Sequence, residues 1–243
     1  MAPRLYCALP LEAGKEIGLP PPAAHHAARV LRLRSGDCVT LFNGEGGEFD
    51  AEILHVARGA VSVRVGSHRA VDRESPLQVT LVQGLAGADR MDWVVQKAVE
   101  LGVTAIRPLT MARSVVQLDP ARAAKREMHW RSIAISACEQ CGRNRLPLLH
   151  ALNRFEQWVA MPSVATLRVF LAPDAATSLS GFARPHGSIE LLIGPEGGLT
   201  REEAGAALDA GFRAMRLGPR ILRTETAPLA ALSALNALWG DWA

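Results

Sequence analysis

The sequence predicts an α/β protein in which a small β-rich domain precedes a larger domain built around a mostly parallel sheet. Between residues 38 and 65, apolar and polar residues alternate with the period of half-buried antiparallel strands. Beyond residue 76, strand-like runs alternate with helix-like segments, which is the pattern of βαβ units. The polar stretch 67–76 separates the two patterns, so we expect domains at 1–72 and 73–243.

The first domain is expected to contain an antiparallel meander preceded by one helix. Asn43–Gly47 is rich in glycine and separates two of the strands, as expected of a hairpin turn. Residues 23–32 fit a helix that places His26, Arg29 and Arg32 near one face. The strands are expected at 38–42, 48–54 and 60–65.

The second domain alternates between the two kinds of element. Thr200 and Glu203 form a capping-box pattern that starts a helix, and Gly211 lies where that helix should end. Pro228 suits the first turn of a final helix. Strands are expected at 77–83, 103–109, 168–171 and 189–193, and further helices at 91–101 and 121–140.

Composition limits the class of protein. An apolar content of 49% supports a folded core, and no apolar run approaches the roughly 18 residues of a membrane span. The N-terminus lacks the pattern of a secretory signal, so a cytoplasmic location is expected. Cys138 and Cys141 have the spacing of a redox or zinc pair, but Cys7 and Cys38 do not form the second pair of a four-ligand zinc site. We therefore expect reduced thiols and no metal.

A net charge of +3 conceals a basic segment. Residues 107–154 carry nine arginines and lysines against three acidic residues. Such a local field suits a polyanion, although a solvated basic helix face explains it equally well.

Two glycine-bearing loops follow strand-like runs near the C-terminus and precede helix-like ones. Gly194–Gly198 lacks the Gly-Lys-Ser/Thr ending of a phosphate loop and the glycine spacing of a dinucleotide fold. Loops at the carboxyl ends of parallel strands are where open α/β sheets bind ligands. Backbone that approaches a ligand closely suits a nucleoside cofactor such as S-adenosylmethionine, and an ordinary strand-to-helix turn is the alternative.

Together, Ile193–Gly198, Leu217-Gly218 and Ile221–Ala227 resemble the signature of the RsmE family. These bacterial enzymes of the SPOUT superfamily methylate N3 of a uridine in 16S ribosomal RNA. Val99 and Cys141 stand where the family usually has threonine and serine. The resemblance extends to His26, Val30–Arg32, Gly36, Asp37, Gln96–Val103, Glu139–Arg143 and Pro147.

The resemblance implies a PUA-like β-barrel domain followed by a SPOUT-type α/β domain tied in a deep trefoil knot. It also implies S-adenosylmethionine as cofactor, a homodimer, and 16S ribosomal RNA within the 30S subunit as substrate. The cofactor-binding residues would be Leu171, Ala172, Ile193, Gly194, Pro195, Glu196, Gly197, Gly198, Leu217, Gly218, Ile221, Leu222, Thr224, Thr226 and Ala227. The RNA-binding residues would be Arg4, His26, Arg29, Arg32, Arg113, Arg143 and Arg145.

Arg223 is the candidate catalytic residue. Uracil N3 is a poor nucleophile while it keeps its imide proton, and a guanidinium can stabilise the charge that develops as the proton leaves. A salt bridge to Glu225 or Glu196 is the alternative role for Arg223. We expect both glutamates to support a helix N-terminus or an arginine rather than to act as bases.

Two other functions remain open on the sequence. One is a non-catalytic RNA-binding ribosome-assembly factor that kept the fold, and the other is a SPOUT methyltransferase acting on another RNA.

Overall fold

The computed structural model describes residues 2–57 and 59–242. The chain forms two compact units. The first consists of the residues through Glu74 together with Ile135–Leu146, and the second of Ser75–Ala134 and the chain from Pro147 onward. The sequence analysis assigned all of residues 73–243 to the second domain, whereas Ile135–Leu146 makes its contacts within the first unit.

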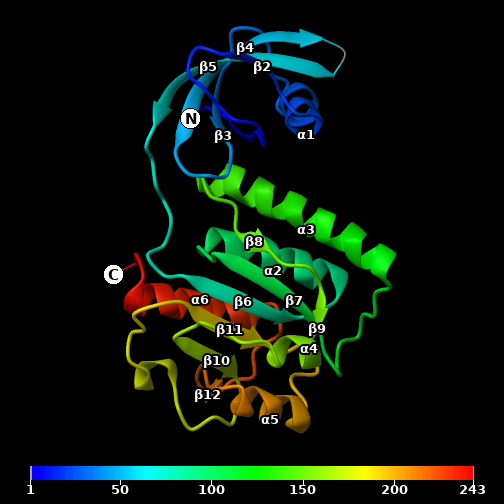
Figure 1. The fold of residues 1–243 in the computed structure, drawn as a ribbon, viewed down its shortest axis with the longest axis vertical. Helices are drawn as coiled ribbons and strands as arrows, with labels where there is room; N and C mark the ends of the chain where they lie inside the picture. Colours follow the sequence, from blue (N-terminus) through cyan, green and yellow to red (C-terminus); the bar gives the residue numbers. More distant parts are fainter. Residues whose placement is uncertain (1, 58, 243) are drawn as a thin grey trace. The chain divides into compact units, whose positions relative to one another are not determined.

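The first unit contains a mixed five-stranded sheet with the order β1-β3-β4-β5-β2 (Figure 1). Its β1 and β3 run parallel, and the other neighbouring pairs are antiparallel. The inward side chains of these strands, with Leu5, Val39 and Ile53 fully or almost fully buried, form one apolar cluster. The strands are β1 (Arg4–Tyr6), β2 (Glu16–Gly18), β3 (Cys38–Phe42), β4 (Glu48–Ala57) and β5 (Ala60–Arg69).

The helix expected over residues 23–32 is shorter and less regular than the sequence predicts. α1 (Pro21–His25) passes directly into a π-helical turn (His26–Val30). Arg32 follows this turn with φ +55°, so it lies outside the helix and is not stacked over His26 and Arg29 as predicted. The prediction was wrong here because periodicity cannot distinguish an α-helix from a π-turn.

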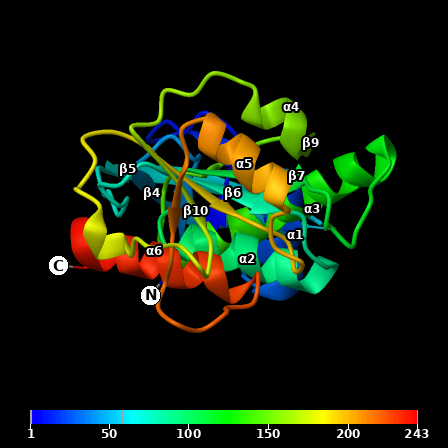
Figure 2. The same ribbon diagram turned by 90° about the horizontal axis from the view of Figure 1, so that it is seen from below.

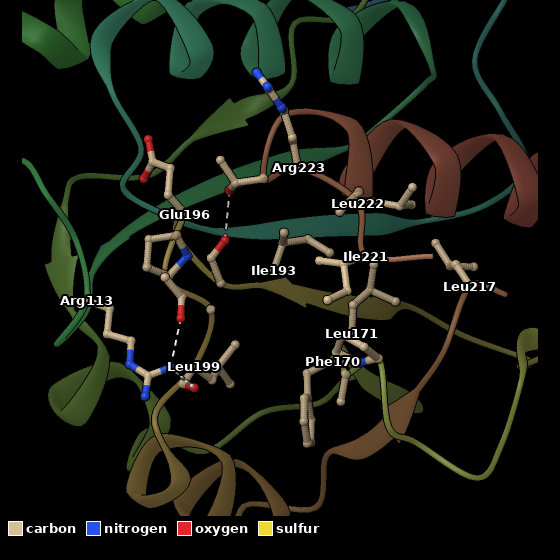
Figure 3. Close-up of a pocket in the computed structure, with 18 of the residues that line it drawn as sticks. Arg113, Phe170, Leu171, Ile193, Glu196, Leu199, Leu217, Ile221, Leu222 and Arg223 are labelled. Atoms are coloured by element: carbon tan, nitrogen blue, oxygen red, sulfur yellow. Dashed lines mark hydrogen bonds between the residues drawn. The ribbon is translucent and has the colours of Figure 1, made fainter. Parts of the chain in front are cut away.

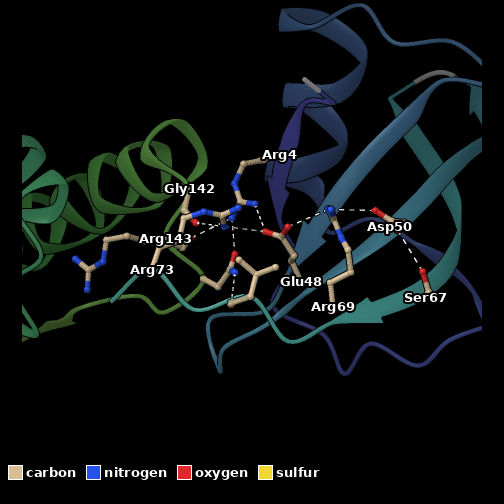
Figure 4. A network of polar contacts seen from close by, with 10 residues as sticks. Arg4, Glu48, Asp50, Ser67, Arg69, Arg73, Gly142 and Arg143 are labelled. Carbon is tan, nitrogen blue, oxygen red and sulfur yellow. Dashed lines mark hydrogen bonds and ion pairs between the residues drawn. The ribbon is translucent and has the colours of Figure 1, made fainter. Parts of the chain in front are cut away.

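A polar network inside the first unit fastens the segment 142–144 to strand β4 (Figure 4). Glu48, only 2% exposed, forms ion pairs with Arg4, Arg69 and Arg73. Arg73 also donates to the carbonyl of Gly142 at 3.0 Å. Because a buried carboxylate is expensive unless charges and donors surround it, this cluster fixes the local chain path.

The second unit is built on a parallel sheet with the order β12-β10-β11-β6-β7-β8, in which β9 also pairs with β7. The strands are β6 (Val79–Gly84), β7 (Ala105–Thr110), β8 (Leu148–Leu149), β9 (Asn153–Arg154), β10 (Leu167–Leu171), β11 (Ile189–Ile193) and β12 (Arg213–Met215).

Helices cover both faces of this sheet. Figure 2 shows α2 and α6 on one face and α4 and α5 on the other. The helices are α2 (Ala88–Glu100), α3 (Pro120–Cys141), α4 (Phe155–Val159), α5 (Arg201–Asp209) and α6 (Thr226–Trp239), of which α3 continues into the first unit. A 3-10 turn occupies Leu179–Gly181.

The strand register brings several chain turns to one edge of the sheet. Ile193 at the end of β11 pairs with Gln83 of β6, and Leu171 at the end of β10 pairs with Met215 of β12. Because these strands are parallel, the loops that follow them leave from the same edge. This edge carries the candidate site.

Candidate functional site

A cavity of about 790 Å³ lies at the carboxyl ends of the central strands of the second unit (Figure 3). Three loops form most of its wall: residues 172–174 after β10, residues 194–200 after β11 and residues 217–225 after β12. Phe170 and Met215, at the ends of their strands, contribute apolar side chains. Much of the wall is therefore backbone and apolar surface supplied by segments far apart in the sequence.

Glycines allow two of these segments to approach closely. A Cβ on Gly84 would lie 2.6 Å from the backbone nitrogen of Pro195, and one on Gly194 would lie 2.9 Å from the carbonyl carbon of Gly198. Real Cβ atoms do not approach backbone so closely, so a side chain at either position would displace the loop after β11.

Thr224 fastens the loop after β12 to the centre of the sheet. Its buried hydroxyl donates to the carbonyl of Gly194 at 2.8 Å and accepts from Nε2 of Gln83 at 3.1 Å. Gln83 is fully buried and also donates to the carbonyl of Gly84 at 3.0 Å. These bonds join β6, the loop after β11 and the loop after β12.

Arg113 and Glu203 hold the loop after β11 from its other side. The Arg113 guanidinium donates to the carbonyls of Gly197 at 2.8 Å and Leu199 at 3.3 Å (Figure 3). Glu203 completes the capping box with Thr200 and also accepts from the backbone of Ala112 at 2.8 Å. The helix start that the sequence predicts is confirmed.

Glu196 supports the N-terminus of α2. Its Oε1 accepts from the backbone N–H of Gly87 at 2.9 Å and from Nη1 of Arg90 at 2.7 Å. Burial alone would raise the pKa of this carboxyl, but the hydrogen bonds and the charge of Arg90 outweigh burial and leave the pKa below its ordinary value. Glu196 is therefore ionised at neutral pH and is poorly suited to take up a proton.

Arg90 connects two carboxylates at the cavity. Besides Glu196, its Nε lies 3.7 Å from Oε2 of Glu225. Glu225 in turn lies 4.0 Å from Nη1 of Arg223 through its other oxygen. The Arg223 side chain is 79% exposed and extends away from Ile193 and Leu171 (Figure 3).

The cofactor-binding residues expected from the sequence line this cavity, with Thr226 as the one exception. Thr226 is the first residue of α6 and its side chain is exposed. Arg90 also lines the cavity but was not expected there, because it lies more than one hundred residues before the glycine loops. Arg223, which was expected to take part in the chemistry, lines the cavity, and so does Arg113, which was expected to bind RNA. The other lining residues that were not expected are Phe170, Pro173, Asp174, Leu199, Thr200, Arg201, Ala204, Met215, Arg220 and Glu225.

Two of the arginines expected to bind RNA are engaged inside the first unit instead. Arg4 is 8% exposed and pairs with Glu48, and Arg143 is 5% exposed and pairs with Glu74. The structure argues against phosphate contacts for both, because each guanidinium is almost fully buried and already paired with a carboxylate.

The remaining residues expected to bind RNA differ in their surroundings. Nδ1 of His26 lies 3.2 Å from a carboxylate oxygen of Glu139. Arg29, Arg32 and Arg145 are exposed on the first unit. Arg113 is also exposed, but it belongs to the second unit and its guanidinium donates to the loop carbonyls of Gly197 and Leu199.

The cysteine pair has no feature of a reactive site. Burial raises the pKa of the Cys138 thiol to about 12, and the thiol lies 3.7 Å from the carbonyl of Arg145. Within residues 2–57 and 59–242, no cluster of histidine, cysteine and acidic side chains is arranged to hold a metal ion. No helix in the same part of the chain has the length and apolar character needed to cross a membrane.

The comparisons with known proteins agree with this architecture. Residues 73–236 match the family model of an RNA methyltransferase domain, and residues 19–66 match that of an RNA methyltransferase PUA domain. The two matched ranges therefore place this chain in the class of RNA methyltransferases with a PUA domain.

The relatives specify the family. A ribosomal RNA small subunit methyltransferase E of Buchnera aphidicola is 33% identical, covering 98% of this chain and 97% of that protein. The structure of the Neisseria gonorrhoeae protein of the same name, solved with bound S-adenosylmethionine, is 41% identical with a TM-score of 0.93 over 100% of both chains. A Legionella pneumophila methyltransferase solved with the same cofactor is 40% identical, with a TM-score of 0.97 over 99% of both chains. This chain belongs to the ribosomal RNA small subunit methyltransferase E family.

Proposed function

We propose that this protein transfers a methyl group from S-adenosylmethionine to N3 of a specific uridine in 16S ribosomal RNA, forming 3-methyluridine. The observation that carries the proposal is the cavity of about 790 Å³ walled by three loops, two of which contain glycine. Its volume lies within the range of roughly 300–1,000 Å³ that is common for small-molecule sites. The cofactor bound in the Legionella and Neisseria structures supports the same assignment.

The residues of the cavity fit this cofactor. S-adenosylmethionine, when bound, supplies a methyl group activated by a positively charged sulfonium. Asp174, Glu196 and Glu225 line the cavity, and their negative charge suits a cationic ligand better than a phosphate. We propose that the loops 194–198 and 217–222 hold the adenosine, with Leu171 and Ala172 flanking it and Thr224 and Ala227 closing the pocket.

Arg223 is the residue that we assign to the chemistry. It lines the cavity from the loop after β12, and its exposed guanidinium is held by no hydrogen bond to the glycine loops, unlike that of Arg113, among the described residues. Such a guanidinium can bind a uracil carbonyl oxygen and stabilise the negative charge that develops when the imide loses its proton.

We also propose how the RNA is held. Arg29, Arg32 and Arg145 are the exposed arginines of the first unit from the expected set, so they are the ones that we assign to phosphates. Substituting all three with alanine should weaken RNA binding and flatten its dependence on salt. If the affinity for RNA and its dependence on salt are both unchanged, these three arginines do not bind the RNA phosphates.

The family resemblance adds further proposals. A deep trefoil knot would involve the loop after β12. The hydrogen bonds from Thr224 to Gly194 and from Gln83 to Thr224 support it, because they carry this loop past β10 to β11 and β6. We further propose a homodimer that acts in the cytoplasm on 16S RNA within the 30S subunit.

The test is methylation by the purified protein with labelled cofactor, on separated RNA pools and on 30S particles, followed by nucleoside analysis. We expect labelled 3-methyluridine in 16S RNA. Label found only in transfer RNA, or on a purine, would refute the substrate and favour another RNA. No label, together with no heat of cofactor binding in calorimetry, would favour a non-catalytic RNA-binding factor.

A further inference from the structure

Glu225 lines the cavity and has a carboxylate oxygen whose hydrogen-bonding capacity is unused. Its Oε2 is buried and has no hydrogen-bond partner among the residues that the structure describes. The nearest cationic groups, Nε of Arg90 at 3.7 Å and Nη1 of Arg223 at 4.0 Å from the other oxygen, are ion-pair neighbours beyond hydrogen-bond length. The carboxylate thus lies between two arginines without a hydrogen bond to either.

A buried acceptor without a donor is unfavourable by about 1–3 kcal/mol, so its presence beside a cavity indicates a donor that arrives with a ligand. The position of Glu225 is well defined. It is the N-cap residue of α6 and follows Thr224, whose hydroxyl is anchored to Gly194 and Gln83. Its carboxylate therefore stands at a fixed place in the wall.

Glu196 also has a buried oxygen without a hydrogen bond, but its place differs. Its other oxygen already accepts from Gly87 and Arg90, which holds this side chain at the start of α2. Glu225, in contrast, lies two residues from Arg223 and shares an ion pair with it. Of the two carboxylates, Glu225 is the one that lies beside the more exposed arginine, since the side chain of Arg223 is 79% exposed and that of Arg90 44%.

Arg223 and Glu225 offer a donor next to an acceptor. The imide edge of uracil offers the complementary pair, a carbonyl oxygen next to the N3–H. Cytosine has a lone pair at N3, which a carboxylate oxygen repels. A site built to accept from an N–H rejects an analogue that lacks it much more strongly than an apolar pocket could.

We infer that Glu225 is a specificity-determining residue, whose carboxylate accepts a hydrogen bond from N3–H of the target uracil while Arg223 donates to the neighbouring carbonyl oxygen. This inference rests on the proposed function and adds the residue that selects the base. It assigns the unused oxygen to the RNA and not to the cofactor.

The test compares wild type with Glu225→Gln, and Glu202→Gln as the matched control, since Glu202 is an exposed glutamate of α5 outside the cavity. Two quantities are measured. The first is the affinity for a non-reactive S-adenosylmethionine analogue, by calorimetry. The second is the affinity, with that analogue bound, for 16S RNA fragments that carry uridine or cytidine at the position that wild type methylates.

Wild type should prefer the uridine fragment. Glu225→Gln should lose roughly tenfold of that preference, the equivalent of one charge-assisted hydrogen bond, because its amide nitrogen can donate to cytosine N3. Its affinity for the analogue should stay within about twofold of wild type, since a group that contacts only the RNA adds nothing to cofactor affinity. The Glu202→Gln control should match wild type in both measurements.

Several outcomes would overturn the inference. An unchanged preference in Glu225→Gln would remove Glu225 from base selection, and a weakened affinity for the analogue would assign the carboxylate to the cofactor. If Glu225→Gln does not fold, Glu225→Asp replaces it. That variant should keep the sign of the preference with weaker RNA binding, and loss of the preference would count against the inference. Absence of 3-methyluridine with wild type would instead refute the proposed function itself.

Discussion

Two substitutions of Thr224 test whether its hydrogen bonds hold the pocket loops together. Thr224→Val keeps the side-chain shape and removes the hydroxyl. Thr224→Ser keeps the hydroxyl and removes a methyl group. If the two hydrogen bonds of the hydroxyl hold the loop after β12, the isosteric valine should be the more damaging change.

The expected loss in the free energy of unfolding follows from the hydrogen bonds of Thr224. Valine leaves the carbonyl of Gly194 and one N–H of Gln83 without their partner, at a place where Thr224 is 6% exposed and Gln83 is fully buried. Each unsatisfied buried group is worth about 1–3 kcal/mol, and Nε2 of Gln83 keeps its bond to Gly84, so we expect a loss of about 2–4 kcal/mol in the free energy of unfolding. Removing the methyl group should cost about 1 kcal/mol.

The assay is urea unfolding followed by tryptophan fluorescence. All five tryptophans belong to the second unit, so the signal reports the unit that contains the pocket. With a urea dependence of a few kcal/mol per molar, the midpoint for Thr224→Val should fall by roughly 1 M, and that for Thr224→Ser by less than half as much. A serine variant as unstable as the valine variant, or less stable, would refute the reasoning.

Three further changes test other parts of the structure. Arg223→Ala should lower the methylation rate at least about tenfold and leave the affinity for the cofactor nearly unchanged. The control variant Arg184→Ala, at an exposed arginine, should behave as wild type. Equal methylation rates for the two variants would remove Arg223 from the mechanism. Gly84→Ala should destabilise the second unit by about 1–3 kcal/mol and weaken cofactor binding in calorimetry, while Gly205→Ala, whose new methyl group meets nothing within 4 Å, should not. Burial alone would raise the pKa of the Glu48 carboxyl, but its arginine partners lower it below the ordinary value of 4.5. Its contribution is therefore complete above that pH and lost as the pH falls below it. The protection factors of the β4 amides, which correct for the intrinsic effect of pH on exchange, should fall in acid for wild type and change less for Glu48→Gln.

The sequence predicted the longer elements because their residues repeat with a clear period. β3 and β11 have the predicted bounds, since a half-buried strand alternates and a buried strand is continuously apolar. β8 and β9 were missed, because two residues are too few to contain a period, whereas the strand-like run expected before the second glycine loop is β12. The predicted end of the helix at 23–32 was wrong for a related reason, since a π-helical turn has no distinct pattern in the sequence.

The site could be predicted only where its residues are neighbours in the sequence. The glycine loops are local motifs, so their lining of the cavity could be anticipated. Arg90 could not, because its partners Glu196 and Glu225 lie more than a hundred residues away. The surroundings of Arg4 could not be predicted either, because the sequence does not reveal that Glu48 lies beside it in the interior.

The charges around the cavity have opposite signs that match two different substrates. Asp174, Glu196 and Glu225 suit a cationic cofactor, whereas five arginines of the wall suit a polyanion, namely Arg90, Arg113, Arg201, Arg220 and Arg223. The arginines differ in how far their charges are already compensated by neighbouring groups. Arg113 is bound to loop carbonyls and Arg90 to two carboxylates, which leaves Arg223 highly exposed beside Glu225. This difference supports our proposal that the base carried by the RNA meets the methyl group of the cofactor beside Arg223 and Glu225.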